Sequence, residues 1–225
     1  MMRLAQFISV LGHPLFMPAY AFGLLIYANP YINMMVSETS KQFTLGILVV
    51  FTIILPILTA IVFKLFGLID SLFMKTAEER KWPFLLTLIW YYMGFQLLTK
   101  IYVPQSFLLL MIGAISAIGI ALIITSRWKI SIHMLGIGGV IGAIIGISQR
   151  FQFDHSLLLI ALILFAGAIG YARLKTNSHN YLATHLSLCH ACKLLSCCKL
   201  IAWLSALIKI RKGMRFRNVH KLKRL

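Results

Sequence analysis

The chain has 225 residues, of which 60% are hydrophobic and 12% are charged, and its mean hydropathy is +0.88. Soluble domains carry about 25% charged residues, so this composition excludes an ordinary soluble protein. The formal net charge of +17 suits an anionic membrane surface. Because no nucleic-acid-binding module surrounds the basic residues, we expect no nucleic acid as a partner. The composition therefore predicts an all-α, polytopic integral membrane helix bundle.

Six apolar stretches approach the ~20 residues that a membrane-spanning helix needs. In chain order they are about Ala5–Tyr27, Phe43–Phe66, Phe84–Val103, Phe107–Thr125, Ile130–Ile147 and Ser156–Tyr171. Pro14, Pro18 and Pro56 lie inside the first two stretches and predict kinks there. Because His13 and the prolines interrupt the first stretch, and no small-residue cleavage site follows it, we expect an uncleaved span rather than a signal peptide.

Residues 67–83 form the largest polar loop between these stretches. The middle of the loop is consistent with a short amphipathic helix that turns Leu72 and Phe73 toward lipid. Pro83 then suits the first turn of the third span, where its missing N–H costs nothing.

The fifth stretch carries glycines at four-residue spacing, namely Gly138, Gly142 and Gly146. Such a strip lets a neighbouring helix approach closely, so we expect it to be a packing surface. A dinucleotide-binding interpretation is poor because no strand precedes these glycines and Ile141 occupies the place of the third motif glycine.

If the six stretches cross the membrane in turn, three polar segments fall on one face. These are the 67–83 loop, the Arg127–Lys129 turn and the 173–179 segment. The other face receives residues 29–41, 103–106 and 148–155. The ionisable residues of interest are thus predicted to share one side of the membrane, as a single site requires.

The shared face combines several cations with a hydroxyl and two histidines. Guanidinium and ammonium groups around titratable imidazoles suit a compact anion, above all phosphate. One imidazole can attack phosphorus while another protonates the leaving oxygen, and no metal or cofactor is then required. The residues are Lys75, Arg80, Lys129, Ser131, His133, Arg173, Lys175 and His179.

These residues resemble the type 2 phosphatidic acid phosphatase superfamily of membrane phosphohydrolases over about residues 8–180. That family carries the motifs Lys-x6-Arg-Pro, Pro-Ser-Gly-His and Ser-Arg-x5-His-x3-Asp. Here Lys75 and Pro83 keep the first spacing, with Trp82 at the arginine position and Arg80 two residues earlier. The opening Gly-His-Pro-Leu-Phe-Met-Pro resembles the start of a divergent bacterial branch of the family.

The second and third motifs are matched in part. Ser131-Ile132-His133 resembles the Ser-Gly-His core, and Arg173 with His179 keeps the Arg-x5-His spacing. The resemblance implies a bacterial inner-membrane enzyme that removes phosphate from a lipid phosphate or pyrophosphate through a phosphohistidine intermediate. It implies that His179 is the nucleophile, that His133 is the general acid, and that phosphate is held by Lys75, Arg80, Ser131 and Arg173.

Ala183 stands where the family has the aspartate that orients the nucleophile. Without an orienting carboxylate the tautomer and ring position of the nucleophile are not fixed. Two alternatives therefore stay open. One is a catalytically impaired relative that binds or transports lipid phosphates, and the other is a structural membrane protein whose cations only set its topology.

Residues 182–225 form a basic tail that differs in composition from the membrane domain of residues 1–181. Residues 173–225 hold twelve Lys or Arg and no acidic residue, against ten and five before them. All four cysteines lie in this tail, but only Cys189 and Cys192 have zinc-ligand spacing, so zinc is the weaker interpretation. The tail is open to two explanations, a displaced last span or a shift of reading frame.

Overall fold

The computed structural model describes residues 2–69, 77–101, 103–125, 131–152, 154–175 and 189. These residues form helices and no strands, so the predicted all-α class is confirmed. The elements are α1 (Met2–Leu11), the 3₁₀ turn η1 (Pro14–Phe16), α2 (Met17–Ala28), α3 (Pro30–Met35), α4 (Glu38–Leu48), the π-helical η2 (Val49–Ile54), α5 (Leu55–Leu65), α6 (Ala77–Leu98), α7 (Gln105–Thr125), α8 (Ile132–Phe151) and α9 (Ser156–Lys175).

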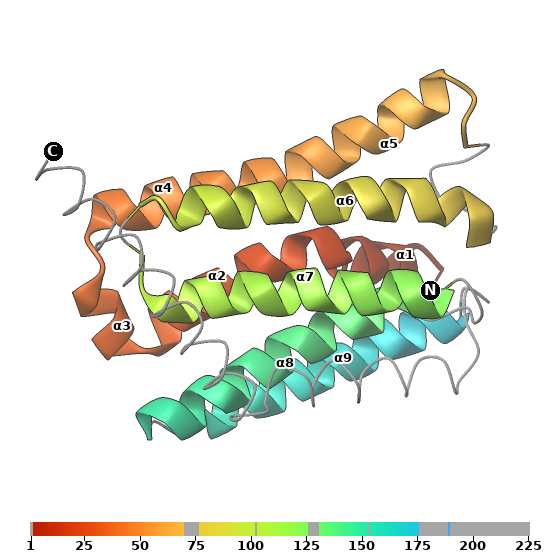
Figure 1. Cartoon of the computed structure of the whole chain (residues 1–225). Helices are drawn as coiled ribbons and strands as arrows, with labels where there is room; N and C mark the ends of the chain where they lie inside the picture. The colour runs from red at the N-terminus through yellow and green to blue at the C-terminus, as the bar shows by residue number, and fades with distance from the viewer. Residues whose placement is uncertain are drawn as a thin grey trace, which may run out of the picture.

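The helices run back and forth in one bundle (Figure 1). The first pass consists of α1, η1 and α2, the second of α4, η2 and α5, and α6 to α9 make one pass each. The beginnings of α1, α6 and α8 and the ends of α5, α7 and α9 point toward the same end of the bundle, which we call the N-terminal end. The short α3 lies at the opposite end, between α2 and α4.

Five segments of the described chain are long and apolar enough to cross a membrane. They are Phe7–Ala28, Glu38–Leu65, Gln105–Ile124, Ile132–Gln149 and Ser156–Lys175. The 22-residue α6 packs against α5 and α7, although its first turn is rich in charged residues. The chain is therefore a polytopic membrane protein.

The third pass begins earlier than the sequence suggested. Pro83 is the seventh residue of α6 and lies inside the helix, so the expectation that it would occupy the first turn was wrong. Ala, Glu, Arg and Lys precede it, and these residues favour the helix strongly enough to extend it back to Ala77. The amphipathic segment expected around Leu72 and Phe73 lies outside the described residues.

The outer surface and the core of the bundle are both apolar. Phe22 of α2 and Phe107 of α7 meet in the core with their ring centroids 4.7 Å apart, and Leu25 and Ile144 are buried nearby in the same cluster. Large apolar side chains such as those of α9 remain exposed on the outside. A large apolar exterior is stable in contact with lipid hydrocarbon but not with water, so the exposed surface supports the membrane assignment.

The kinks expected at the prolines take two specific forms. Pro14 and Pro18 accompany the 3₁₀ turn between α1 and α2, while Pro56 follows the π-helical η2. A proline lacks the N–H of the regular helix and clashes with the carbonyl four residues back, which a wider turn relieves. The Leu55 N–H accordingly donates to the Val50 carbonyl, five residues back.

These two irregular segments pack against each other inside the bundle. Thr52 of η2 is fully buried, and its hydroxyl donates to the Leu48 carbonyl at 2.7 Å and reaches the Leu15 carbonyl at 3.4 Å. Hydrocarbon cannot satisfy backbone groups that a helix break releases, so neighbouring helices must do so. The second pass in this way supports the break in the first.

A second polar contact joins the helices at the end of the bundle opposite the N-terminal end. The buried His155 places its Nδ1 2.9 Å from the Ser148 hydroxyl of α8. The neighbouring Asp154 carboxylate accepts the Ser156 backbone N–H at 2.9 Å, which satisfies a donor in the first turn of α9. Hydrogen bonds from Ser156 lower the pKa of Asp154.

Glycines allow close helix contacts at several places. Gly138, Gly142 and Gly146 are all buried on α8, as a packing strip requires. Gly94 of α6 faces η2, where an added Cβ would lie 2.9 Å from the Phe51 Cβ. Because a Cβ cannot move without its backbone, a larger residue at Gly94 must push α6 and η2 apart.

We predict that Gly94→Ala lowers the thermal unfolding midpoint of the protein in detergent. Overpacking a tight contact costs about 1–3 kcal/mol, which exceeds the gain of up to about 1 kcal/mol from replacing a helical glycine. Gly119→Ala in α7 is the matched control, because nothing lies within 4 Å of an added Cβ there. Equal midpoints for the two variants would contradict the close contact of α6 with η2.

Candidate functional site

The candidate site begins at the break between α1 and α2. Pro14 disfavours the α-conformation at the preceding residue, and His13 is accordingly extended, with φ −66° and ψ 134°. Its Nδ1 accepts the Leu15 backbone N–H at 3.4 Å and caps the 3₁₀ turn. In the neutral imidazole the proton must then reside on Nε2, which leaves His13 as a donor on its other side.

The first turn of α8 packs against this break. An added Cβ at Gly136 would lie 2.9 Å from Met17 Cγ and 3.4 Å from Pro14 Cα, so a side chain there would clash with the break. His133 lies three residues earlier on the same face of α8. Its ring stands edge-to-face to that of His13, with centroids 5.4 Å apart and planes at 83°.

The last turns of α9 close the other side of the break. An added Cβ at Gly12 would lie 2.7 Å from Ile169 Cδ1, so α1 and α9 touch there. Arg173 lies one turn further along α9, and its Nη1 donates to the Ser9 hydroxyl of α1 at 3.3 Å. The Arg173 guanidinium also interacts electrostatically with His13.

Ser131 occupies the N-cap position of α8, two residues before His133, and is fully buried. Its carbonyl accepts the Leu135 N–H at 3.0 Å, which begins the helical hydrogen bonding. The N-terminus of α8 carries the positive end of the helix dipole. The beginning of α8 therefore adds a partial positive charge beside two imidazoles and a guanidinium.

Three of the six predicted site residues lie in this part of the bundle: Ser131 at the N-cap of α8, His133 in its first turn, and Arg173 in the last turn of α9. Arg80 is the fourth residue of α6, which begins at the same end of the bundle. Lys75, Lys129 and His179 lie outside the described residues. Lys175 extends along the outside of α9, with its ammonium 5.5 Å from the ring centroid of Tyr171.

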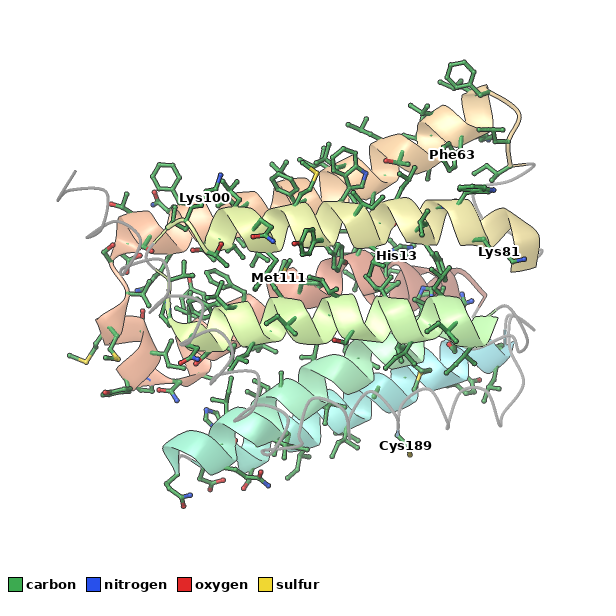
Figure 2. The ribbon with its side chains drawn as sticks, viewed as in Figure 1. His13, Phe63, Lys81, Lys100, Met111 and Cys189 are labelled. Atoms are coloured by element: carbon green, nitrogen blue, oxygen red, sulfur yellow. The ribbon has the colours of Figure 1, made fainter. Side chains whose placement is uncertain are left out.

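Ser9 and His13 complete the cluster, and sequence reasoning did not assign either to the site. Figure 2 shows His13 inside the bundle, closer to Lys81 at the N-terminal end than to Lys100 at the other end. The available signal was the Gly-His-Pro sequence inside an otherwise apolar stretch. A polar aromatic residue at a helix break in a membrane span is costly unless neighbours satisfy it, so it is a candidate for a functional position.

The cluster is suited to bind an anion. Arg173 supplies a guanidinium, the two imidazoles supply N–H donors or a transferable proton, and Ser131 adds a hydroxyl. The described residues contain no group of three or more His, Cys, Asp or Glu side chains that could hold a metal ion. The same contacts also fit a purely structural role, in which these residues only join α1, α8 and α9.

The chain matches no family model, no curated protein and no solved structure. The functional argument therefore depends on the residues themselves.

We predict that cysteines at positions 12 and 169 form a disulfide on mild oxidation. A Cβ at Gly12 would lie 2.8 Å from Ile169 Cγ1. Because Cγ1 is bonded to the Ile169 Cβ, the two Cβ atoms would be at most about 4.3 Å apart, a separation that a disulfide, with Cβ atoms about 3.5–4.5 Å apart, can bridge. The double variant Gly12→Cys/Ile169→Cys would be made after the four native cysteines are replaced by serine, and linked peptides would be identified by mass spectrometry.

The matched control for this cross-link is Gly12→Cys/Gly167→Cys. Gly167 lies on the same helix, but nothing is within 4 Å of a Cβ added there. Linkage at 169 and none at 167 supports the placement of the break against α9. Equal linkage of both pairs, or none of either, contradicts the assembly of the site.

Proposed function

We propose that this protein is a membrane phosphohydrolase that removes phosphate from a lipid phosphate or pyrophosphate through a phosphohistidine intermediate. The observation that carries the proposal is the convergence of Ser131, His133 and Arg173 from α8 and α9 at one end of a membrane bundle. We propose a bacterial inner membrane as its location, on the resemblance of its sequence motifs.

The charge balance of the cluster supports a phosphate ligand. The described residues around the helix break include a guanidinium, two imidazoles and the positive end of the α8 dipole, and no carboxylate is among them. Positive charge is expensive inside a membrane, and a bound anion lowers that cost. Arginine suits phosphate in particular, because its planar fork matches two phosphate oxygens.

The position of the cluster supports a lipid substrate. The apolar span that contains the break begins at Phe7, so Gly12 lies about 8 Å inside that span. The cluster is thus set back from the beginning of the span rather than exposed at its tip. A substrate whose phosphate lies at the headgroup level of a bilayer, with its apolar part in the hydrocarbon, suits that depth.

In the proposed mechanism, His179 attacks phosphorus and the bond from phosphorus to the leaving oxygen breaks. His133 donates a proton to that oxygen as it leaves, so the lipid departs as an alcohol or as a phosphate shortened by one group. Water then attacks the phosphohistidine, and free phosphate leaves with His179 regenerated. Lys75, Arg80, Ser131 and Arg173 would stabilise the charge of the equatorial oxygens.

A non-catalytic binder is the second candidate, and Ala183 is the observation that favours it. An imidazole nucleophile needs a partner that fixes its tautomer. If no other residue supplies one, the same cations bind lipid phosphates without hydrolysing them.

We predict that the detergent-purified protein releases phosphate from at least one member of a panel of phosphatidate, phosphatidylglycerophosphate and a polyprenyl pyrophosphate. His179→Ala should abolish release, because it removes the nucleophile. His133→Ala should lower kcat by about 10²- to 10⁴-fold, the usual contribution of a general acid. Arg173→Gln should weaken turnover by about 10- to 100-fold, as loss of a charged hydrogen bond implies.

His155→Asn is the control, since this buried histidine lies at the other end of α8 and α9. It should leave phosphate release unchanged. A folded wild-type protein that binds short-chain phosphatidate without releasing phosphate would point to the binder. A protein that neither binds nor hydrolyses any member of the panel would overturn both candidates.

A further inference from the structure

One feature of the cluster lies outside the proposed chemistry: the contact between His13 of the broken first span and His133 of α8. Their ring planes are nearly perpendicular, with centroids 5.4 Å apart. This is the edge-to-face arrangement in which the positive edge of one ring meets the negative face of the other. The contact limits the orientations that the His133 ring can adopt.

The backbone holds His13 firmly in this position. Its Nδ1 accepts the Leu15 N–H, and Pro14 fixes the turn that follows. On one side the turn is packed against Gly136 of α8, and on the other Gly12 is packed against Ile169 of α9. His13 is thus a side chain on a rigid break, whereas His133 sits in the first turn of a helix.

We propose that His13 is a positioning residue, whose imidazole fixes the ring plane of His133 so that His133 directs its proton toward the leaving oxygen. This inference rests on the proposed function for its consequence in catalysis, and on the ring contact for its structural part. The Arg173 guanidinium of α9 also interacts electrostatically with His13, so His13 is linked to both α8 and α9.

Two substitutions at position 13 distinguish the effect of the aromatic ring from the effect of the hydrogen bond that caps the 3₁₀ turn. His13→Asn keeps a short side-chain acceptor for the Leu15 N–H, and so keeps the 3₁₀ turn, but it removes the ring. His13→Phe keeps an aromatic edge and face but removes the acceptor. His155→Asn is the matched control, because it makes the same change at a buried histidine on the opposite end of the bundle.

The first measurement is steady-state phosphate release. His13→Asn should lower kcat by about 10- to 100-fold, the cost of misplacing a reacting group by about 1 Å, with KM within about twofold of wild type. His13→Phe should restore kcat to within about threefold of wild type, because the ring contact remains. A variant His13→Asn that raises KM and keeps kcat would overturn the inference, since His13 would then bind substrate. Wild-type kcat in His13→Asn, or loss of kcat in His13→Phe alone, would overturn it as well.

The second measurement does not depend on activity. In ¹⁵N-histidine-labelled protein in detergent micelles, the imidazole signals of His133 should shift in His13→Asn and stay in place in His155→Asn. His133 signals that are unchanged in His13→Asn would overturn the inference. If wild-type protein hydrolyses none of the lipid phosphates, the proposed function fails, and this spectrum alone decides whether His13 positions His133.

Discussion

The structure depends on one constraint, the need to accommodate a broken helix inside a membrane. Gly12, His13 and Pro14 end α1 and turn the chain before α2 begins. A break of this kind releases backbone groups that lipid cannot satisfy, so protein must surround it on all sides. It is surrounded by η2, by the first turn of α8 and by the last turns of α9. Two of these surrounding elements, α8 and α9, carry His133 and Arg173, and both residues therefore lie near His13 at the break.

The same constraint accounts for the polar side chains elsewhere in the bundle. Thr52 supports the break through carbonyl oxygens, Ser148 pairs with His155, and the Trp90 indole donates to the Thr59 hydroxyl across α5 and α6 at 3.0 Å. Each contact joins neighbouring helices or two turns of one helix. The cluster at the break differs from them because it gathers positive charge, and helix packing alone does not require charge. This difference is the physical ground for proposing a functional site at the break and not at the other polar contacts.

Much of this organisation follows from local patterns. The length of the apolar stretches predicted the spans, and alternation of the passes predicted that residues near 131 and 173 would share one end of the bundle. Pro83 shows where local patterns mislead, because strong helix formers before it outweighed the usual preference of proline for a first turn. His13 shows a different difficulty. Its neighbours in sequence identify a helix break, but its partner His133 is 120 residues away, and no local pattern specifies a contact at that separation.

The sequence by itself determined the class of protein, the approximate number of passes, and the residue types available for chemistry, because these properties depend on composition and on the periodicity of apolar residues. Tertiary structure alone decided that the first span contributes Ser9 and His13 to the candidate site. Close approach at Gly12 and Gly136 sets the spacing of α1, α8 and α9, and that spacing brings the rings of His13 and His133 into edge-to-face contact. Contacts of this kind depend on how whole helices pack, so they emerge only when the bundle is assembled.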